Sequence, residues 1–466
     1  MMNERKGYIE LLFKKYKVDA SSRSKLFAEY LNEELIVNAF TQMQQNQNAM
    51  LDHWKQKVKL DDIKQASLTM PNATAGKEYS HTIDIGRKPL DQIAAFDLVE
   101  FESTGLDYDP GTRTIRGVPE AAGDYKLVFR FQIAESQEWY EKQISFVVNP
   151  NPKTLWKDLP SDEKDPYWKK DAAEVATSFG ANTIAAASKR GRSHAHEGKF
   201  RDDEFDFLFF EETGWGVVAV SDGAGSAKSS RKGSVLACDA VLDYFTSAIP
   251  PEDWQAMDEI VTKFSTGKNE ENSKALSQLL IGNLSKAAYG AHKCIAEFAS
   301  KKKVPIKDFS ATLLFSLVKK FDFGYCIASF GVGDGGIGIY NESTQTATLL
   351  TLPDGGEFAG QTRFITMPEI FKDENYFKRF SIKVVEDFTA LIFMTDGITD
   401  PKFQTDANLG RFEIWQKLWK DLQGENDDKT VVDLNKDNEQ LASQLCAWLD
   451  FWSPGNHDDR TIAILF

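Results

Sequence analysis

Two apolar runs of this chain end abruptly at an aspartate. Asp222 follows the run 215–220 and Asp396 follows the run 391–394, and a glycine comes next in each case. Ionised carboxylates beside buried strands are unfavourable unless they are paired or bound to a cation. Carboxylate and carbonyl oxygens are the ligands that Mg²⁺ and Mn²⁺ prefer. The residue types and their positions therefore predict a site for hard divalent metal ions.

Further residues extend this pattern. Asp458 precedes the last apolar run, 461–466, and Gly223 leaves room for its own carbonyl oxygen to act as a ligand. An Asp-Gly pair alone is an ordinary turn, so the prediction depends on the whole set. Two aspartates stay open at this point: Asp334 is a further metal contact or a turn residue, and Asp400 is a turn or helix-start residue or a metal contact.

The segment from residue 176 to residue 466 contains the elements that would position these aspartates. Strand-like apolar runs surround two long helical stretches, 230–248 and 272–301, and two shorter ones, 412–422 and 437–451. We expect strands at 215–220, 311–318, 325–330, 337–340, 347–352, 391–394 and 461–466. This arrangement predicts an α+β fold in which helices cover sheets.

The first 175 residues follow other patterns. Residues 1–66 are predicted to be helical, because apolar residues recur at helical spacing through 22–58. This region either packs on the rest of the chain or docks a partner. Residues 67–150 contain short alternating runs separated by turn signals, which predicts a small β-sandwich. Residues 151–175, rich in Pro, Asp and Lys, are expected to form a linker.

Composition excludes several classes of function. The net charge of −15 argues against a nucleic-acid partner, because phosphate backbones bind basic surfaces. The four cysteines lie far apart in the sequence without a Cys-x-x-Cys pair, so a disulfide framework or a zinc site of cysteines is not expected. No run approaches the ~20 apolar residues of a membrane span. We expect a cytoplasmic protein without a membrane span.

The order of the motifs resembles that of the metal-dependent serine/threonine phosphatases of type 2C, in their compact bacterial branch. The resemblance covers residues 176–466. Five segments carry it in the family's order: Val220-Ser-Asp-Gly-Ala-Gly, Asp308-Phe-Ser-Ala-Thr, Val332-Gly-Asp-Gly, Thr395-Asp-Gly-Ile-Thr-Asp and Asp458-Asp-Arg-Thr. It implies a four-layer α-β-β-α sandwich and a protein-serine/threonine phosphatase that requires two ions of Mn²⁺ or Mg²⁺, with a third ion as an option.

The resemblance also implies roles for individual residues. Asp222 would be shared by the two ions, whose bridging water attacks the phosphorus atom of phosphoserine or phosphothreonine. Asp396 and Asp458 would complete the shell of the first ion, and the carbonyl of Gly223 would be a further ligand. Asp203 would orient a metal-bound water. These are the residues for which catalytic and metal-binding roles are predicted.

The group that grips the substrate phosphate is less clear. The segment 191–203 resembles the bacterial branch's first motif, with Asp202 where Gln or Glu usually stands, but the eukaryotic phosphate-binding arginine has no match at its usual spacing. Arg190, Arg192 and His194 are the candidates for substrate binding. His194 and His196 could also form a zinc pair, although a surface loop with histidines is the expectation. Ala224 stands in the place of a eukaryotic histidine.

The N-terminal region adds a second resemblance. Residues 105–125 are similar to a bacterial immunoglobulin-like repeat, which is a binding or spacer module. This similarity implies a small all-β immunoglobulin-like domain that, with the N-terminal helices, selects a partner or phosphoprotein substrate, such as the cognate serine/threonine kinase of a signalling module. The alternative is a catalytically impaired pseudophosphatase that acts as a binding or scaffold protein in such a module.

Overall fold

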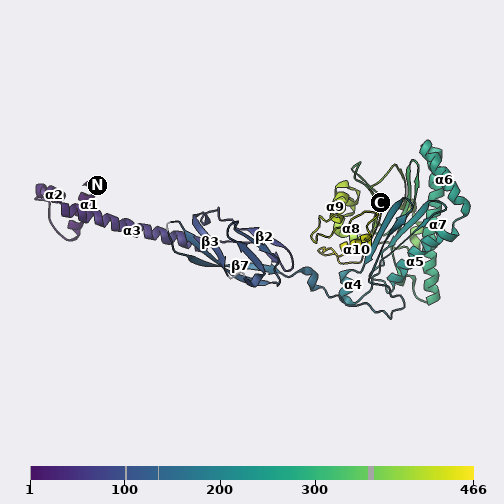
Figure 1. The fold of residues 1–466 in the computed structure, drawn as a ribbon, viewed down its shortest axis with the longest axis horizontal. Helices are drawn as coiled ribbons and strands as arrows, with labels where there is room; N and C mark the ends of the chain where they lie inside the picture. The colour runs from purple at the N-terminus through teal and green to yellow at the C-terminus, as the bar shows by residue number, and fades with distance from the viewer. Residues whose placement is uncertain (1, 100–101, 135, 355–361) are drawn as a thin grey trace. The chain divides into compact units, whose positions relative to one another are not determined.

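The computed structural model describes residues 2–99, 102–134, 136–354 and 362–466 (Figure 1). Contacts between residues divide the chain into two compact units, Met1–Leu155 and Trp156–Phe466. Within the described ranges, no helix combines the length and the apolar character that a membrane crossing requires.

The first unit begins with three helices, α1 (Met2–Lys15), α2 (Ser24–Tyr30) and α3 (Glu34–Gln65). The ring of Tyr8 on α1 lies 5.8 Å from that of Phe40 on α3, measured between centroids, so the middle of α1 packs on the N-terminal part of α3. The stretch expected to continue as one helix through 22–58 is broken between α2 and α3. The C-terminal turns of α3 pack into the core of the following β-domain, where Ile63 is fully buried.

The remainder of the first unit is a β-sandwich of two sheets. One sheet has the strand order β1-β7-β6-β3 and the other the order β2-β5-β4. The strands are β1 (Ala73–Thr74), β2 (Tyr79–Thr82), β3 (Ile93–Val99), β4 (Leu106–Asp109), β5 (Thr114–Gly117), β6 (Gly123–Ile133) and β7 (Tyr140–Asn149), with short helices η1 (Leu90–Gln92), η2 (Glu102–Thr104) and η3 (Pro152–Leu155). Alternate residues of β6, such as Leu127, Phe129 and Phe131, are buried in the core.

The second unit contains a five-stranded sheet, β10-β11-β12-β13-β16, and a six-stranded sheet, β15-β14-β17-β18-β9-β8. The first sheet comprises β10 (Glu204–Phe210), β11 (Trp215–Ser221), β12 (Leu313–Phe321), β13 (Gly324–Val332) and β16 (Phe380–Val385). The second comprises β8 (Ala172–Phe179), β9 (Asn182–Lys189), β14 (Gly336–Asn341), β15 (Thr346–Leu349), β17 (Ala390–Met394) and β18 (Arg460–Leu465). All paired neighbours within both sheets are antiparallel.

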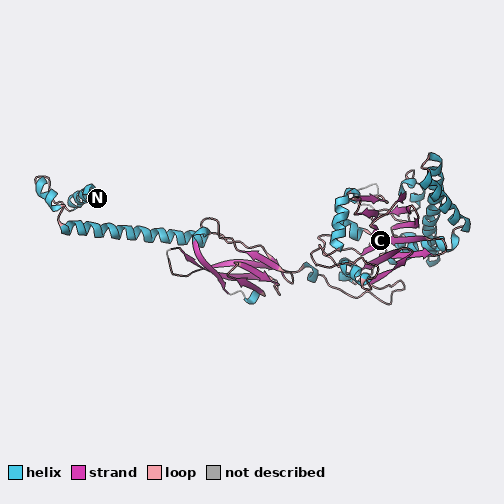
Figure 2. Cartoon of the chain, turned by 45° about the horizontal axis from the view of Figure 1, so that its top comes forward, coloured by secondary structure: helices cyan, strands magenta, loops and turns pink. Residues whose placement is uncertain are grey.

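Helices cover the outer face of each sheet, as Figures 1 and 2 show. On the five-stranded sheet lie α5 (Ser230–Asp243), η4 (Tyr244–Ala248), α6 (Pro251–Thr266) and α7 (Glu270–Lys302). On the six-stranded sheet lie α8 (Asp396–Phe403), α9 (Phe412–Leu422) and α10 (Leu441–Trp448). The remaining short helices are α4 (Arg192–Glu197), η5 (Ile306–Phe309), η6 (Pro368–Lys372), η7 (Tyr376–Arg379) and η8 (Asp406–Gly410).

The two-residue period of the strands separates three layers of core. In β11, Val217 packs with the helices α5–α7, whereas Val218 packs between the two sheets. In β18, Ile464 packs with the helices α8–α10, whereas Ala463 faces the space between the sheets. Because successive side chains of a strand point to opposite faces, each sheet is buried on both sides. The expected α+β, four-layer α-β-β-α architecture is confirmed.

The segment expected to be a linker, 151–175, is divided between the units. Residues 156–171 belong to the second unit, and β8 begins at Ala172. Side chains anchor this segment: Asp165 is 2.7 Å from the Arg231 guanidinium, and Lys169 is 2.9 Å from the Glu204 carboxylate. The Lys169 ammonium group also donates to the carbonyl of Asp203 at 2.6 Å. The chain entering the second unit is therefore attached directly to the predicted site.

Candidate metal centre

The ends of several strands bring the predicted aspartates together. Asp222 follows β11 directly, Asp396 begins α8 just after β17, and Asp334 lies between β13 and β14. Carboxylate oxygens of these three residues all lie within 4.8 Å of one another. Of the two aspartates that the sequence left open, Asp334 thus joins this group. Asp400, one helical turn after Asp396, is exposed and accepts a 3.4 Å hydrogen bond from the Asn456 side chain.

Asp203 forms the buried side of the group. It has no solvent exposure, and the hydroxyl of Thr395 donates to its Oδ2 at 2.8 Å. Asp203 is also close enough to Asp222 for its charge to raise the pKa of the Asp222 carboxyl. Asp458, the fourth predicted ligand, is close enough for its charge to raise the pKa of Asp203, Asp222 and Asp396. The four predicted metal-binding aspartates therefore belong to a single charged cluster.

Close packing of backbone explains the glycines beside these aspartates. A Cβ on Gly223 would lie 2.6 Å from the carbonyl oxygen of Asp202, and one on Gly397 would lie 1.9 Å from that of Asp459. A Cβ on Gly191 would lie 2.3 Å from the carbonyl carbon of Asp458. Such approaches exclude any side chain. The glycines thus allow segments distant in the sequence to meet at the cluster.

Hydroxyl groups hold the backbone of Asp222 in place. The Asp222 amide donates to Oγ1 of Thr312 at 2.8 Å, and the Thr312 amide donates to the Asp222 carbonyl at 2.8 Å. The hydroxyl of Ser221 donates to the Thr312 carbonyl at 2.5 Å. The small-hydroxyl motif 308–312 therefore positions the strand end that carries Asp222, rather than contacting the carboxylates itself.

The cluster carries more negative charge than its surroundings neutralise. Burial, followed by the charges of Asp396 and Asp203, raises the pKa of Asp222, and burial with Asp334 and Asp458 raises that of Asp396. Burial and the charge of Asp459 raise the pKa of Asp203 to about 7. Adjacent carboxylates have this effect on one another because each disfavours the charged form of its neighbours.

Several carboxylate oxygens of the cluster are buried without a hydrogen-bond partner. They are Oδ1 of Asp203, Asp334 and Asp396, and Oδ1 of the adjacent Asp202 is buried without a partner as well. A buried acceptor without a partner is costly, and a buried carboxylate oxygen more so. Divalent cations would satisfy these oxygens and offset the charge, and an all-oxygen ligand set suits Mg²⁺ or Mn²⁺. The residues present thus fit the metal ions that the sequence predicts.

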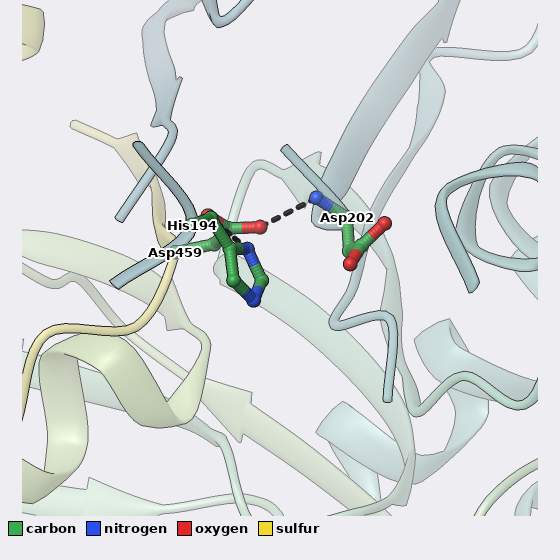
Figure 3. Close-up of side chains that lie close together, drawn as sticks. All are labelled: His194, Asp202 and Asp459. Carbon is green, nitrogen blue, oxygen red and sulfur yellow. Dashed lines mark hydrogen bonds and ion pairs between the residues drawn. The ribbon is translucent and has the colours of Figure 1, made fainter. Parts of the chain in front are cut away.

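Asp459 has a different environment from its neighbours. The Gly191 amide donates to its Oδ1 at 2.6 Å, the Asp202 amide donates to Oδ2, and the His194 ring nitrogen Nδ1 lies 3.1 Å from Oδ1 (Figure 3). Burial alone would raise the pKa of Asp459, but these hydrogen bonds and the charge of His194 lower it. Asp459 therefore fixes the loop around Asp458 and the turn that carries Asp202.

The candidates for phosphate binding have other partners. The Arg190 guanidinium donates to Asp158 and to the carbonyls of Lys199 and Leu159, each at 2.8 Å. The Arg192 guanidinium donates to the Asp450 carbonyl at 2.6 Å and lies 2.8 Å from its carboxylate. These contacts engage the donors that a phosphate would need. A substrate-binding role for either arginine stays a prediction.

His194 is not the surface residue expected from its loop. It lies on α4, is 8% exposed and has its side chain against Asp459. Burial lowers its pKa, but the hydrogen bond to Asp459 and the charges of Asp459, Asp458 and Asp202 prevail and raise it to about 10. His196, two residues on, accepts a hydrogen bond from the Lys157 amide at 3.0 Å instead. The two histidines therefore do not act as a pair.

Two features of the site were not predicted from the sequence. His194, Asp202 and Asp459 form a second group whose ligand atoms lie within 4.8 Å of one another. The hydroxyl of Thr362 donates a short hydrogen bond to Oδ2 of Asp334. The sequence singled out His194 and the pairs Asp202-Asp203 and Asp458-Asp459, but their separation along the chain gave no indication that His194, Asp202 and Asp459 are in contact. No local pattern marks Thr362.

Comparisons with known proteins found several solved structures that are similar to this chain. Among solved structures, the serine/threonine phosphatase Stp1 from Staphylococcus aureus is 14% identical over 63% of this chain and 96% of its own, with a TM-score of 0.35. The catalytic domain of the phosphatase PstP in complex with two manganese ions is 14% identical over 60% of this chain and 96% of its own, with a TM-score of 0.34. The S. agalactiae serine/threonine phosphatase is 15% identical over 61% of this chain and 98% of its own, with a TM-score of 0.31. No curated protein matches the chain.

The second unit is thus a four-layer α-β-β-α sandwich with a carboxylate cluster at the ends of its strands. The sequence model of the protein phosphatase 2C family matches residues 190–449, more than half of the chain. The chain therefore belongs to the protein phosphatase 2C family, and the resemblance drawn from its motifs is confirmed.

Proposed function

We propose that this protein hydrolyses phosphoserine and phosphothreonine in phosphoproteins, with two bound Mn²⁺ or Mg²⁺ ions. The observation that carries the proposal is the set of three buried, unpartnered carboxylate oxygens on Asp203, Asp334 and Asp396. A similar structure, the PstP catalytic domain, is described as a complex with two manganese ions. Family membership supports the phosphatase activity.

The roles of the residues follow from their positions. When bound, the divalent ions would supply a water activated for attack and would neutralise charge on the phosphoryl oxygens. Asp222, Asp396, Asp458 and the carbonyl of Gly223 would hold them. Asp203, anchored through Oδ2 by Thr395, keeps Oδ1 for orienting a water molecule. Both sheets are buried on both faces, so the strand ends that carry the carboxylates are rigid. The carboxylates therefore have little freedom to move apart.

The test compares hydrolysis of p-nitrophenyl phosphate and of a phosphothreonine peptide by the wild type and by Asp222→Asn, with and without Mn²⁺. We expect Mn²⁺-dependent hydrolysis by the wild type and a loss of at least about 100-fold in kcat for the variant, because Asp222 lies in the centre of the cluster. Asp206→Asn is the matched control: Asp206 is partly buried on β10, and its carboxylate accepts a 2.8 Å hydrogen bond from the Phe207 amide. Wild-type protein that binds Mn²⁺ but releases no phosphate would favour a scaffold protein instead.

The first unit supports a role in partner selection. On α3, Met50, Leu51 and Trp54 have exposed fractions of 66%, 57% and 65%. Exposed apolar residues at helical spacing are typical of a surface that another protein covers. The proposed partner is a phosphoprotein substrate, with a serine/threonine kinase as the leading example.

A further inference from the structure

Three side chains from separate segments form a buried group beside the aspartate cluster. His194 comes from α4, Asp202 from the turn before β10, and Asp459 from the loop before β18. Their exposed fractions are 8%, 8% and 1%, and one ligand atom from each lies within 4.8 Å of the others. Figure 3 shows the His194 ring beside the Asp459 carboxylate, with the Asp202 side chain approaching from another segment. None of these contacts was evident from the sequence.

The hydrogen bonds to Asp459 determine which nitrogen of His194 is free. Both oxygens of Asp459 accept backbone amides, one from Gly191 and one from Asp202. A carboxylate in this position acts only as an acceptor, so Nδ1 of His194 carries the hydrogen of the 3.1 Å contact. The surrounding carboxylates keep the ring protonated in the metal-free protein, and a metal ion that displaces the second proton would find the lone pair on Nε2. Metal-binding histidines commonly have this arrangement, in which the other ring nitrogen donates to a carboxylate.

Nε2 of His194 faces the aspartate cluster. It lies 3.8 Å from Oδ1 of Asp458, and a Cβ on Gly225 would be 3.8 Å from it. Two ligands that are each ~2.0–2.2 Å from one metal ion are separated by roughly 3–4 Å. The distance between Nε2 and the Asp458 carboxylate therefore fits two ligands of one ion.

Asp202 supplies the second, independent observation. Its side chain is more than nine-tenths buried, and Oδ1 has no hydrogen-bond partner. Both backbone groups of Asp202 are hydrogen-bonded. Its amide donates to the Asp459 carboxylate, and its carbonyl accepts from the Ser234 hydroxyl at 2.5 Å. The backbone that carries this side chain is therefore fixed, and Oδ1 is buried without a donor.

We propose that His194 and Asp202 bind a transition-metal ion through Nε2 and Oδ1, with Asp458 as a shared ligand on the side of the aspartate cluster. Imidazole nitrogen favours transition metals such as Co²⁺, Zn²⁺ and Fe²⁺, whereas an all-oxygen set favours Mg²⁺ or Mn²⁺. The group of Asp222, Asp334 and Asp396 would then take Mg²⁺, and the His194 group would take a different metal. This inference deepens the proposed function, and the metal-binding part of it does not depend on catalysis.

In the first test, untagged protein is stripped of metal, saturated with Mg²⁺ and then titrated with Co²⁺. Visible absorption and calorimetry monitor the binding of Co²⁺. The wild type is expected to bind Co²⁺ with a spectrum altered by nitrogen ligation. His194→Gln and Asp202→Asn should each weaken Co²⁺ binding by at least about 10-fold. His196→Gln, on the same helix but bonded to the Lys157 amide, should bind Co²⁺ like the wild type. Undiminished Co²⁺ binding by His194→Gln would overturn the proposal.

A measurement on the wild type covers the case in which the variants do not fold. Pulsed electron paramagnetic resonance of protein that holds Mn²⁺ in the absence of Mg²⁺ is expected to show coupling to one histidine nitrogen, and its absence would contradict the site. An increase in KM for a phosphopeptide in His194→Gln, with Co²⁺ binding unchanged, would instead make His194 a substrate contact. Phosphatase assays are independent of the Co²⁺ titration and of the resonance measurement. Nitrogen coupling in a protein that hydrolyses no phosphoester would contradict the proposed function but support the metal site.

Discussion

Asp203 is completely buried, yet one of its carboxylate oxygens has no hydrogen-bond partner. Thr395 satisfies the other oxygen, and the neighbouring carboxyl of Asp222 cannot be a donor when both groups are ionised. The same lack of a donor recurs in Asp334 and Asp396. Without a cation, Asp203 and Asp396 resist ionisation, and the stability of the metal-free protein must therefore depend on pH.

The direction of this dependence follows from the pKa values. Asp203, with a pKa of about 7, and Asp202, with a pKa of about 6, hold protons in the folded protein that the unfolded chain releases near its ordinary pKa of 3.8. The folded state binds more protons between these values, so stability falls as pH rises from about 4 to about 7. His194, with a pKa of about 10, contributes stability below its ordinary pKa of 6.5 and loses it as pH rises through 10. All three groups act in the same direction.

We therefore expect the metal-free protein to unfold at a lower temperature at pH 7.5 than at pH 5.5, measured by thermal melts in a chelator. Mn²⁺ should raise the melting temperature most at pH 7.5, because protons compete with the metal at lower pH. A metal-free protein that becomes more stable between pH 5.5 and pH 7.5 would contradict the charge distribution described here.

Gly397 makes a second residue-level prediction. In Gly397→Ala, the new Cβ would lie 1.9 Å from the Asp459 carbonyl oxygen, so the loop before β18 must shift. We expect a destabilisation of roughly 1–3 kcal/mol from overpacking and weaker Mn²⁺ binding, measured by denaturant unfolding and calorimetry. Gly410→Ala is the control, since its Cβ would meet no atom within 4 Å. Equal effects of the two changes would argue against a special contact at Gly397.

At the scale of elements, the segment between β15 and β16 reaches the metal centre through Thr362. This residue donates to Asp334, and the neighbouring Arg363 is 2.8 Å from Asp373 and 3.8 Å from Asp354. Arg379, from η7, also forms an ion pair with Asp354. The amide of Asp354 in turn donates to the carbonyl of Gly333 at 2.8 Å, next to Asp334. These contacts hold the hydroxyl of Thr362 beside the carboxylate.

Removing this hydroxyl should loosen Asp334. We expect Thr362→Val to bind Mg²⁺ about 10-fold more weakly, because partners that orient a ligand typically contribute 10–100-fold to affinity. Thr362→Ser keeps the hydroxyl and should bind Mg²⁺ nearly like the wild type. Calorimetric titration of both variants distinguishes the hydrogen bond from a packing effect of the methyl group, which would weaken binding in the serine variant as well.

At the scale of the whole molecule, the chain combines a four-layer catalytic-type domain with a unit of helices and a β-sandwich. The long helix α3 contributes Ile63 to the sandwich core but leaves Trp54 and its apolar neighbours exposed. In the proposed function, chemistry belongs to the rigid strand ends of the second unit and recognition to the accessible surface of the first.

The role of α3 is testable with substrates of different size. Trp54→Gln should leave hydrolysis of p-nitrophenyl phosphate unchanged, because the residue is outside the second unit. With a phosphoprotein partner, we expect kcat/KM to fall roughly 10-fold, in line with an exposed aromatic that becomes buried on binding. His53→Gln, at the adjacent position on α3, is the matched control. An unchanged kcat/KM for every phosphoprotein tried would remove the selection role from this surface.

Local sequence was sufficient to predict that helices cover sheets in the second unit, whereas the four-layer arrangement was implied by the family resemblance. Apolar runs such as 215–220 and 461–466 form β11 and β18, and the order of the Asp-Gly motifs identified the family. These are properties of short segments, since strand burial and turn chemistry depend on neighbours in the chain. The same local signals placed Asp222 and Asp396 at strand ends.

Only the tertiary structure decided how distant residues share the site. Gly191 and Asp459 are 268 positions apart, and their contact is what buries His194 beside Asp202. Likewise, the carboxylates of Asp158 and Asp450 engage Arg190 and Arg192, and the Thr362 hydroxyl reaches Asp334. Local periodicity does not indicate which distant residue forms a given buried hydrogen bond. The choice of partner depends on the packing of both sheets and on the space that the glycines leave. The sequence by itself therefore determined the class of site and its strand-end aspartates, and the packing decided which other groups face them.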